Sequence, residues 1–200
     1  MHLYYAPASP FARKVLVTLH ETGQDDAVTL IGSEQTPLKP DPANVTQNPL
    51  GKVPTLTRPD GPALYDSRVI CRYLDARAGA KLYPAQRIWE VMTLEATADG
   101  ILDAAVLMVY EGRVRPEENR FPDYVEAQWT KITRTLDAIE ARWMSHLSGP
   151  LDMGQIGVGC ALGYLDFRHG GRDWRGGRAE LAAWFETFDA RPAMIGTRPA

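Results

Sequence analysis

The hydrophobic and polar positions near the amino terminus change from strand-like to helix-like spacing. Residues 2–6, His-Leu-Tyr-Tyr-Ala, form a short apolar run before a proline, which predicts a strand. Residues 9–23 then place apolar side chains at helical intervals, which predicts a helix. Ser9 suits the N-cap, Pro10 the first helical position and Gly23 the end of that helix. The chain is therefore expected to begin as a strand-turn-helix unit.

The alternation of strand and helix patterns continues to residue 79. Residues 27–31 predict a second strand, and the polar, proline-containing stretch after it carries no predicted element. Residues 53–66 predict a hairpin with Pro-Asp-Gly at 59–61 as its turn. Residues 67–79 predict a helix that begins at a serine and ends near a glycine. The expected order of elements is β-α-β followed by β-β-α.

From residue 86 onward the apolar spacing is helical and predicts no strand. Apolar residues recur at helical intervals over 91–108 and again over 125–143. Residues 152–168 form a glycine-rich helical pattern, and residues 179–191 form a fourth one. An α/β part followed by an all-helical part implies two packed units.

We therefore expect an α/β domain over residues 1–78, a linker over 79–85 and an all-helical domain over 86–200. The composition agrees with this division. A chain of 200 residues, 44% of them apolar and 24% charged, is sufficient for one large core or two smaller ones.

The charge of the chain bears on its partners. A formal net charge of −3 argues against a broad nucleic-acid surface, and we expect no nucleic-acid partner. One local exception is the arginine- and glycine-rich segment 168–178, which superficially resembles a basic RNA-binding segment. Its position between two helical patterns instead predicts an interhelical loop, with Trp174 packed against the core.

The sequence also predicts where the protein is located and whether it binds a metal. No apolar run approaches the roughly 20 residues of a membrane helix, and the amino terminus does not have the residue order of a signal peptide. We therefore expect a cytoplasmic protein that does not insert into a membrane. Cys71 and Cys160 lie in apolar helical patterns and are expected to be buried free thiols. Two cysteines alone cannot build a zinc site, so no metal is expected.

Three features of the first domain can carry chemistry, and each also has a purely structural interpretation. Ser9 at a helix start favours an anion such as a thiolate, but a Ser-Pro step is also an ordinary helix cap. Pro54 can force a turn that leaves the Val53 backbone free to pair with an extended peptide, or it can simply form a tight turn. Asp66 and Ser67 suit the ammonium and carboxylate groups of an amino acid, or they can merely cap the next helix.

Three motifs carry these residues. Ser-Pro-Phe-x-Arg-Lys-Val spans residues 9–15, Asn-Pro-x-Gly-Lys-Val-Pro-x-Leu spans 48–56, and Tyr-Asp-Ser-x-x-Ile-x-x-Tyr-Leu spans 65–74. In this order and followed by a helical half, they resemble the cytosolic glutathione transferase superfamily, most of all the bacterial glutathione transferase-like proteins with a serine near the amino terminus. The resemblance implies an α/β thioredoxin-like N-terminal domain plus an all-α C-terminal domain, the glutathione transferase fold.

The resemblance also implies glutathione as co-substrate, lying along the first domain. Pro54 would follow a cis peptide bond, and the Val53 backbone would pair with the cysteinyl moiety. Asp66 and Ser67 would hold the γ-glutamyl end, and Ser9 would lie near the sulfur. Many members carry Glu where this chain has Asp66, whose shorter side chain keeps the charge but reaches less far.

Four further residues receive roles from the resemblance. Lys39 and Lys52 are candidates for binding the glycine carboxylate. In the helical half, Asp152 and Gln155 occupy the places of the superfamily's buried capping motif, and we expect their role to be structural. Asp99 lies where an acidic side chain can reach across a dimer interface to the partner's glutathione, or it can be a solvated helix position or a local cap.

The implied chemistry is activation of the glutathione thiol, whose unperturbed pKa of about 8.5 leaves little thiolate at neutral pH. Ser9 would donate a hydrogen bond to the thiolate and would not act as a base. Tyr5 is the rival donor, because other transferase classes use a phenol near the end of the first strand. Tyr4 points to the other face and is expected in the core. No cysteine lies near Ser9, which disfavours the exchange chemistry of the cysteine-based classes.

We expect a homodimeric glutathione transferase that joins glutathione to small apolar electrophiles, as detoxification enzymes do. The electrophile would bind against Phe11, Met108 and Tyr110, which can equally be ordinary core residues. Two alternatives stay open. One is a glutathione-dependent thiol reductase or peroxidase, and the other is a non-catalytic, transferase-like binding protein.

Overall fold

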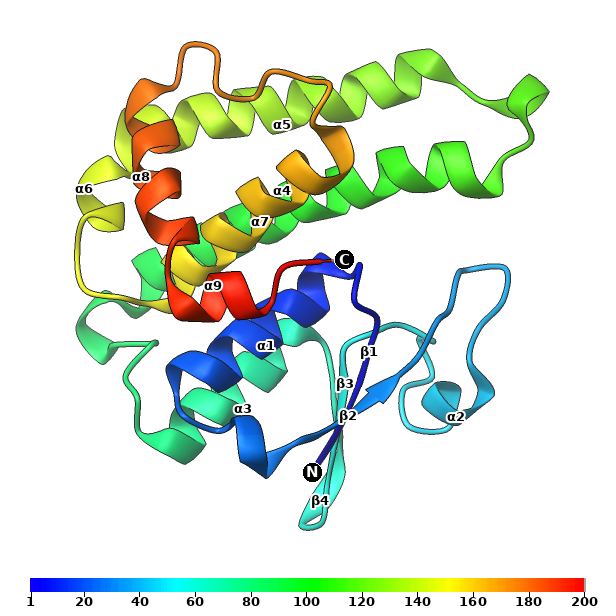
Figure 1. Ribbon diagram of the computed structural model, residues 1–200, viewed down its shortest axis with the longest axis vertical. Coiled ribbons are helices and arrows are strands. Elements are labelled where there is room, and N and C mark those ends of the chain that lie inside the picture. Colours follow the sequence, from blue (N-terminus) through cyan, green and yellow to red (C-terminus); the bar gives the residue numbers. More distant parts are fainter. Residues whose placement is uncertain (200) are drawn as a thin grey trace. The chain divides into compact units, whose positions relative to one another are not determined.

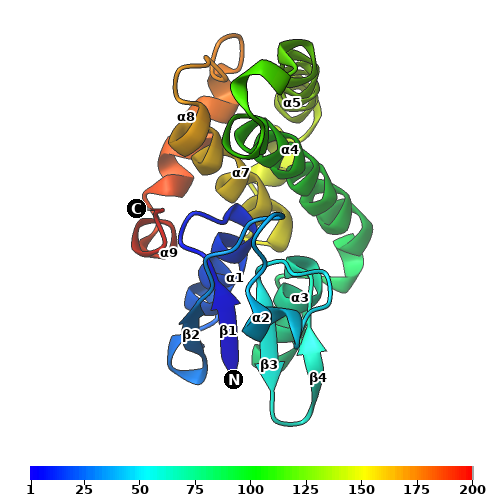
Figure 2. The same cartoon turned by 90° about the vertical axis from the view of Figure 1, so that its right-hand side faces the viewer.

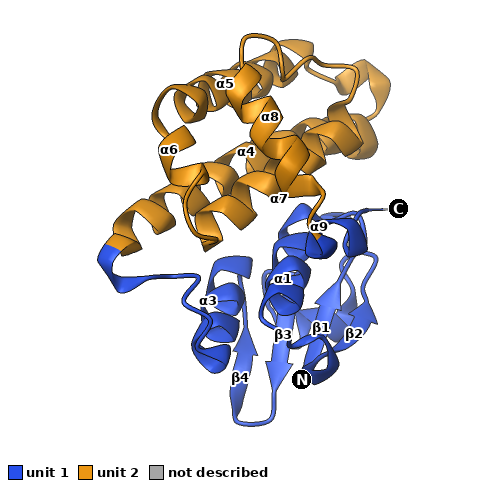
Figure 3. Ribbon diagram, turned by 60° about the vertical axis from the view of Figure 1, so that its left-hand side comes forward, with its two compact units in different colours: residues 1–86, 192–200 blue, residues 87–191 orange. Residues whose placement is uncertain are grey.

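The computed structural model describes residues 1–199. The chain divides into two compact units: unit 1 comprises Met1–Gln86 together with the chain from Pro192 onward, and unit 2 comprises Arg87–Arg191 (Figure 3). Within residues 1–199, no helix combines the length and the apolar character needed to cross a membrane.

Unit 1 is built on a four-stranded mixed sheet. Its strands are β1 (His2–Tyr5), β2 (Thr29–Gly32), β3 (Thr55–Arg58) and β4 (Gly61–Leu64), in the order β2-β1-β3-β4 (Figure 2). β1 pairs parallel with β2 and antiparallel with β3, and β3 and β4 form the predicted hairpin. Leu3 and Leu56 are register partners, and both side chains are fully buried, so the apolar core of the unit lies against these two strands. The thioredoxin-like prediction is confirmed.

Two longer helices of unit 1 pack against each other, α1 (Pro10–Glu21) and α3 (Ser67–Ala78). Ser9 is the N-cap of α1, as predicted, and Pro10 is its first helical residue. α3 ends at Gly79, whose φ of 63° lies in the left-handed region that glycine adopts without steric cost. Three short elements that the sequence pattern did not predict complete the unit: η1 (Asp25–Ala27), α2 (Pro42–Val45) and α9 (Pro192–Gly196). A further short element, η2 (Ala85–Arg87), includes the last residues of this part of unit 1 and the first residue of unit 2.

The segment that begins at Pro192 packs with unit 1, whereas the pattern of the sequence predicted one helical domain over residues 86–200. α9 lies against α1. The guanidinium of Arg13, on α1, donates to the carbonyl oxygen of Met194 at 2.9 Å and to the hydroxyl of Thr197 at 3.4 Å. Arg13 is only 4% exposed, so this charge is buried and its hydrogen bonds hold the end of the chain on α1.

Unit 2 is all-helical, as predicted. Its described helices are α4 (Ile88–Val114), η3 (Glu117–Asn119), α5 (Pro122–Arg142), α6 (Met144–Leu147), α7 (Met153–His169) and α8 (Ala179–Asp189). α4 and α7 lie side by side over much of their length (Figure 1). A Cβ on Gly157 would lie 3.2 Å from the Cβ of Ala98, and one on Gly154 would lie 3.1 Å from the Cβ of Leu94. The glycines of α7 therefore allow the close approach of α4.

The start of α7 is held by a buried polar cluster. Asp152 is fully buried and is the N-cap, accepting the Gln155 backbone N–H at 3.2 Å. The Gln155 side chain donates to the carbonyl oxygens of His146, Gly149 and Pro150 at 3.0 to 3.2 Å. The His146 Nε2 atom approaches Asp152 Oδ2 to 2.8 Å, close enough for an ion pair although the angles are poor for a hydrogen bond. Asp152 and Gln155 therefore have the structural, capping role expected from the sequence.

The arginine-rich segment between α7 and α8 is an interhelical loop, as predicted. Trp174 is 1% exposed, and its indole N–H donates to Asp166 at 2.7 Å. The arginines that follow α7 form ion pairs within unit 2: Arg172 with Glu126, Arg175 with Asp166, and Arg178 with Asp137. Both cysteines are buried and form no disulfide.

We expect Arg13→Ala to lower the free energy of unfolding by about 2 kcal/mol, because buried charge-assisted hydrogen bonds are lost and two acceptors are left unpaired. Urea denaturation would measure the change. Hydrogen exchange should become faster over residues 192–199 before it does so in the sheet. Arg134→Ala, at an exposed position of α5, is the matched control and should change the stability by less than about 0.5 kcal/mol. Unchanged exchange at the end of the chain would contradict the role of Arg13.

Candidate functional site

Four segments of unit 1 start or end at one edge of the sheet. β1 and β2 are parallel, with Tyr5 opposite Gly32, so the segments that follow them lie at the same end. β3 is antiparallel to β1, with Thr55 opposite Tyr4, so the segment that precedes β3 lies there as well. β4 is antiparallel to β3, and its carboxyl end reaches the same edge. These segments carry seven of the site residues predicted in this unit: Ser9, Lys39, Lys52, Val53, Pro54, Asp66 and Ser67.

Ser9 lies where β1 gives way to α1. Its Oγ accepts the backbone N–H of Ala12 at 3.2 Å, so the side chain faces its own helix. The Ser9 backbone N–H donates to the carbonyl oxygen of Ala6 at 2.9 Å, which fixes the turn. A hydroxyl that accepts one hydrogen bond still has its own hydrogen to donate. Capping and donation to a ligand are therefore compatible at this residue.

The turn before β3 presents unpaired backbone. The Val53–Pro54 peptide bond is cis, as the resemblance implied. The preceding carbonyl oxygen, that of Lys52, accepts from the side chains of Asn44, Asn48 and Thr55 at 2.9 to 3.1 Å. Within residues 1–199, the N–H and C=O of Val53 have no hydrogen-bond partner. The turn is therefore anchored on one side and open for backbone pairing at Val53.

Asp66 and Ser67 begin α3. Asp66 is the N-cap and accepts the Arg68 backbone N–H at 3.1 Å. The same carboxylate accepts from the Arg68 guanidinium at 2.8 and 3.3 Å. Ser67 is 2% exposed, and no hydrogen bond within the described residues uses its hydroxyl. A helix N-terminus beside an unused hydroxyl suits a carboxylate.

The pKa of the Asp66 carboxyl lies below its ordinary value. Partial burial disfavours the ionised form and by itself would raise this pKa, but the hydrogen bonds and charge of Arg68 and the charge of Lys14 outweigh burial. Lys14 is a fully buried residue of α1. Asp66 therefore stays ionised and can accept hydrogen bonds from a cation.

The remaining predicted residues of unit 1 differ in their exposure. The side chains of Lys39 and Lys52 are exposed, and Lys39 closes a small turn by exchanging backbone hydrogen bonds with Thr36 at 3.0 and 3.1 Å. Tyr5 is half-buried at the end of β1. The prediction that Tyr4 belongs to the core is wrong, since Tyr4 is also half-buried. Strand alternation makes its neighbour Leu3 the buried residue of β1.

Two groups that shape the site were not predicted. Arg68 pairs with Asp66, and Asn44 together with Asn48 anchors the turn before Val53. Asp66 and Arg68 are two residues apart at the start of a helix, whereas side chains that meet on a helix face are three or four residues apart. No pattern in the sequence therefore predicts this ion pair. Asn48 is the first residue of the second motif, but the motif did not predict that its side chain bonds the Lys52 carbonyl oxygen.

The comparison with known proteins decides the family. Residues 8–77 match the family model described as glutathione S-transferase, N-terminal domain, and residues 122–187 match that described as glutathione S-transferase, C-terminal domain. The "Uncharacterized GST-like protein YibF" of Escherichia coli (strain K12) is 32% identical over 205 residues, which cover 100% of this chain and 98% of the relative. The chain belongs to the glutathione S-transferase family.

Solved structures of the glutathione S-transferase family give the same result. A glutathione transferase family member from Pseudomonas fluorescens Pf-5, crystallised with bound glutathione, is 46% identical with a TM-score of 0.96 and covers 100% of this chain and 98% of its own. A second structure from that organism, with bound S-(propanoic acid)-glutathione, is 44% identical with a TM-score of 0.92 and covers 100% of both chains.

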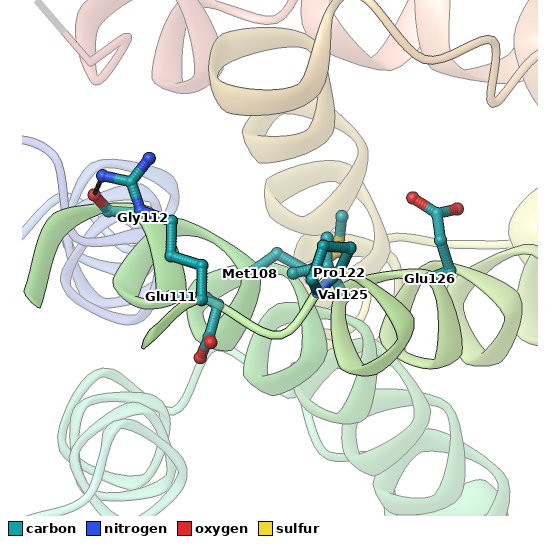
Figure 4. Close-up of a pocket in the computed structure, with 7 residues that line it drawn as sticks. Met108, Glu111, Gly112, Pro122, Val125 and Glu126 are labelled. Atoms are coloured by element: carbon teal, nitrogen blue, oxygen red, sulfur yellow. Dashed lines mark hydrogen bonds between the residues drawn. The ribbon is translucent and has the colours of Figure 1, made fainter. Parts of the chain in front are cut away.

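A separate cavity of about 270 Å³ lies within unit 2, where α4 ends and α5 begins. Figure 4 shows Met108, Pro122 and Val125 gathered between Glu111 and Glu126. The carboxylates are already paired: Glu111 accepts from the Phe121 N–H and from Arg115, both at 2.9 Å, and Glu126 pairs with Arg172. Of the predicted site residues only Met108 lines this cavity. Within residues 1–199, no group of His, Cys, Asp and Glu could hold a metal ion.

We expect Arg68→Gln to raise the pKa of Asp66, because the strongest cationic partner of the carboxylate is removed. The titration of the Asp66 side-chain carboxyl by NMR would measure this pKa. Since the folded-state pKa is lowered, the pair stabilises the protein above the unfolded-state pKa, and this stability is lost as the pH falls through the folded-state value. The pair is half-exposed, so the loss should be below about 1 kcal/mol.

Arg72→Gln is the matched control for this titration, because Arg72 is an exposed arginine of the same helix that contacts the Tyr83 ring. It should leave the Asp66 titration unchanged. An Asp66 pKa that does not respond to Arg68→Gln would contradict the assignment.

Proposed function

We propose that the protein is an active glutathione transferase that joins the glutathione thiolate to small electrophiles. One observation carries this proposal. Ser9, the unpaired backbone of Val53 and the start of α3 all lie at the same edge of the unit 1 sheet. These groups match the chemistry of the tripeptide: a thiol, a peptide backbone and a zwitterionic amino-acid end. The glutathione bound in the Pseudomonas fluorescens relative supports the same ligand here.

Ser9 stabilises the thiolate in this proposal. Its hydroxyl hydrogen is available, because the oxygen accepts from Ala12 and the hydroxyl donates to no group within residues 1–199. Lowering the pKa of the thiol by two units requires about 2.7 kcal/mol, which one charge-assisted hydrogen bond and the start of a helix can supply. The thiolate sulfur then attacks the electrophilic carbon, a C–S bond forms, and the leaving group departs with the electron pair of its bond.

The rest of the tripeptide binds along the same edge. The Val53 N–H and C=O pair with the cysteinyl residue, next to Pro54. The γ-glutamyl ammonium donates to Asp66, whose two oxygens have room for a second cation beside Arg68, and its carboxylate accepts from Ser67 and the first N–H groups of α3. The exposed ammonium groups of Lys39 and Lys52 bind the glycine carboxylate.

We further propose that the transferase acts in the cytoplasm, where glutathione is kept reduced. Its two cysteines are buried, which disfavours a mechanism in which a protein thiol is exchanged. Turnover of mixed disulfides or hydroperoxides faster than of electrophiles would favour a reductase or peroxidase. Failure to bind immobilised glutathione would favour a non-catalytic binding protein.

We expect Ser9→Ala to lower kcat/KM by about tenfold to a hundredfold, since one charge-assisted hydrogen bond to the thiolate is lost. The pH profile of kcat/KM should shift to higher pH, because the bound thiol becomes harder to ionise. The loss of the N-cap should also lower the free energy of unfolding by about 1 kcal/mol. Steady-state kinetics with an aromatic halide from pH 5 to 9 would measure the catalytic effect.

Ser9→Thr is the matched control, because it keeps both the hydroxyl and the cap, and it should restore most of the activity. Glutathione binding by the Ser9 variants, measured by calorimetry, separates binding from catalysis. An unchanged pH profile in Ser9→Ala would exclude the serine mechanism, and Tyr5→Phe would then test the rival donor.

We also propose that two copies of the chain associate through α4. Trp89, Met92 and Leu107 are 75%, 43% and 42% exposed and share one face of this helix. Asp99, in contrast, is 7% exposed and is not a solvated position of α4. A face of exposed apolar side chains along one helix suits a second copy of the same surface, as expected for a homodimer.

Trp89→Glu should convert the dimer to a monomer in light scattering after size exclusion, because it buries an unpaired charge in the interface. Phe121→Glu is the matched control, since Phe121 is also a large exposed apolar residue, 59% exposed, but lies outside α4. A parent protein that is monomeric at about 100 μM, or a Trp89→Glu variant that stays dimeric, would contradict this assignment.

A further inference from the structure

Arg68, in the first turn of α3, places a positive charge at the start of this helix. Its guanidinium donates through Nη2 to Asp66 Oδ2 at 2.8 Å and through Nε to Asp66 Oδ1 at 3.3 Å. Two contacts between a guanidinium and a carboxylate fix the orientation of the guanidinium plane as well as its distance. The charge of Arg68 is therefore held beside the Asp66 carboxylate.

The ion pair of Asp66 and Arg68 is accessible to a ligand. The side chains of Asp66 and Arg68 are 52% and 55% exposed, so neither charge is enclosed by the protein. The carboxyl end of β4 leads directly into this pair, at the same edge of the sheet as Ser9 and Val53. The edge therefore presents a negative and a positive group side by side.

Ser67, between these two residues, indicates that a ligand accepts a hydrogen bond here. Ser67 is only 2% exposed, and its hydroxyl has no hydrogen-bond partner within residues 1–199. A buried hydroxyl without a partner is costly, and a ligand that accepts from it removes this cost. The hydroxyl and the helix start offer only partial positive charges to an anion, whereas Arg68 offers a full one.

We propose that Arg68 binds the α-carboxylate of the γ-glutamyl residue of glutathione and thereby selects ligands that carry a carboxylate at this end. The inference rests on the proposed function and adds a binding residue to the same site. The ligand ammonium then pairs with Asp66 and the ligand carboxylate with Arg68, while Asp66 and Arg68 keep their own contact. The four charges alternate in sign, so each has neighbours of opposite sign. A guanidinium suits this role because its five N–H donors can bond two carboxylates at once.

Two analogues of glutathione test the two charges of its γ-glutamyl end separately. Glutaryl-Cys-Gly lacks the amino group and keeps the carboxylate, whereas 4-aminobutanoyl-Cys-Gly lacks this carboxylate and keeps the amino group. Calorimetry at neutral pH measures the dissociation constants of both analogues and of glutathione. We expect the wild-type protein to bind 4-aminobutanoyl-Cys-Gly about tenfold or more weakly than glutathione, because one charge-assisted contact is lost.

Variants of Arg68 assign this contact to one residue. Arg68→Gln should weaken the binding of glutathione and of glutaryl-Cys-Gly by about tenfold each. It should not weaken the binding of 4-aminobutanoyl-Cys-Gly, because Asp66 stays ionised and keeps its contact with the amino group. Arg68→Lys keeps the charge without the planar fork and should lie between the two. Arg72→Gln removes a positive charge one helical turn further along α3 and, as the matched control, should leave all three constants unchanged.

Two results would overturn the proposal. One is an equal loss on all three ligands in Arg68→Gln, which would mean that the residue only supports the helix start, and the other is unchanged glutathione binding in this variant. A protein that binds glutathione through Arg68 but conjugates no electrophile would contradict the proposed activity alone. An active transferase whose KM for glutathione does not rise in Arg68→Gln would contradict the role of Arg68 alone.

Discussion

The central position of β1 in the sheet is the constraint on which unit 1 depends. β1 pairs with β2 on one side and β3 on the other, and its register with β3 places Leu3 opposite Leu56, both fully buried. A slip of one residue would put the half-buried Tyr4 in the place of Leu3. The same register brings the segments that follow β1 and precede β3 to one edge. One strand register therefore determines both the burial of the two leucines and the assembly of the candidate glutathione site.

The polar groups at that edge serve the fold and the proposed chemistry together. Ser9 and Asp66 satisfy the first N–H groups of α1 and α3, so each is held in place before any ligand arrives. The turn at Val53 is fixed by Asn44 and Asn48, which bond the Lys52 carbonyl oxygen, and the Val53 backbone has no hydrogen-bond partner in the described part of the chain. Pre-organised groups of this kind lower the entropy that binding has to offset.

In unit 2, small residues set the packing of the two central helices. Gly154 and Gly157 let α7 approach α4 closely, because a Cβ on either glycine would lie 3.1 to 3.2 Å from a side chain of α4. The arginines of the loop after α7 pair with carboxylates of the same unit: Arg172 with Glu126, Arg175 with Asp166 and Arg178 with Asp137. The arginine-rich loop is therefore neutralised by local ion pairs, which fits its assignment as an interhelical loop.

The sequence by itself determined the longer elements, their caps and the family, because these signals involve residues a few positions apart. Ser9, Asp66 and Gly79 lie where the caps were expected, and the motifs from Ser9 to Leu74 identify the superfamily. Only the tertiary structure decided the partners. The Arg13 side chain bonds the Met194 carbonyl oxygen across 181 positions, and Arg172 pairs with Glu126 across 46. Such contacts depend on how elements pack, and no periodicity of one segment records which distant atom will meet it.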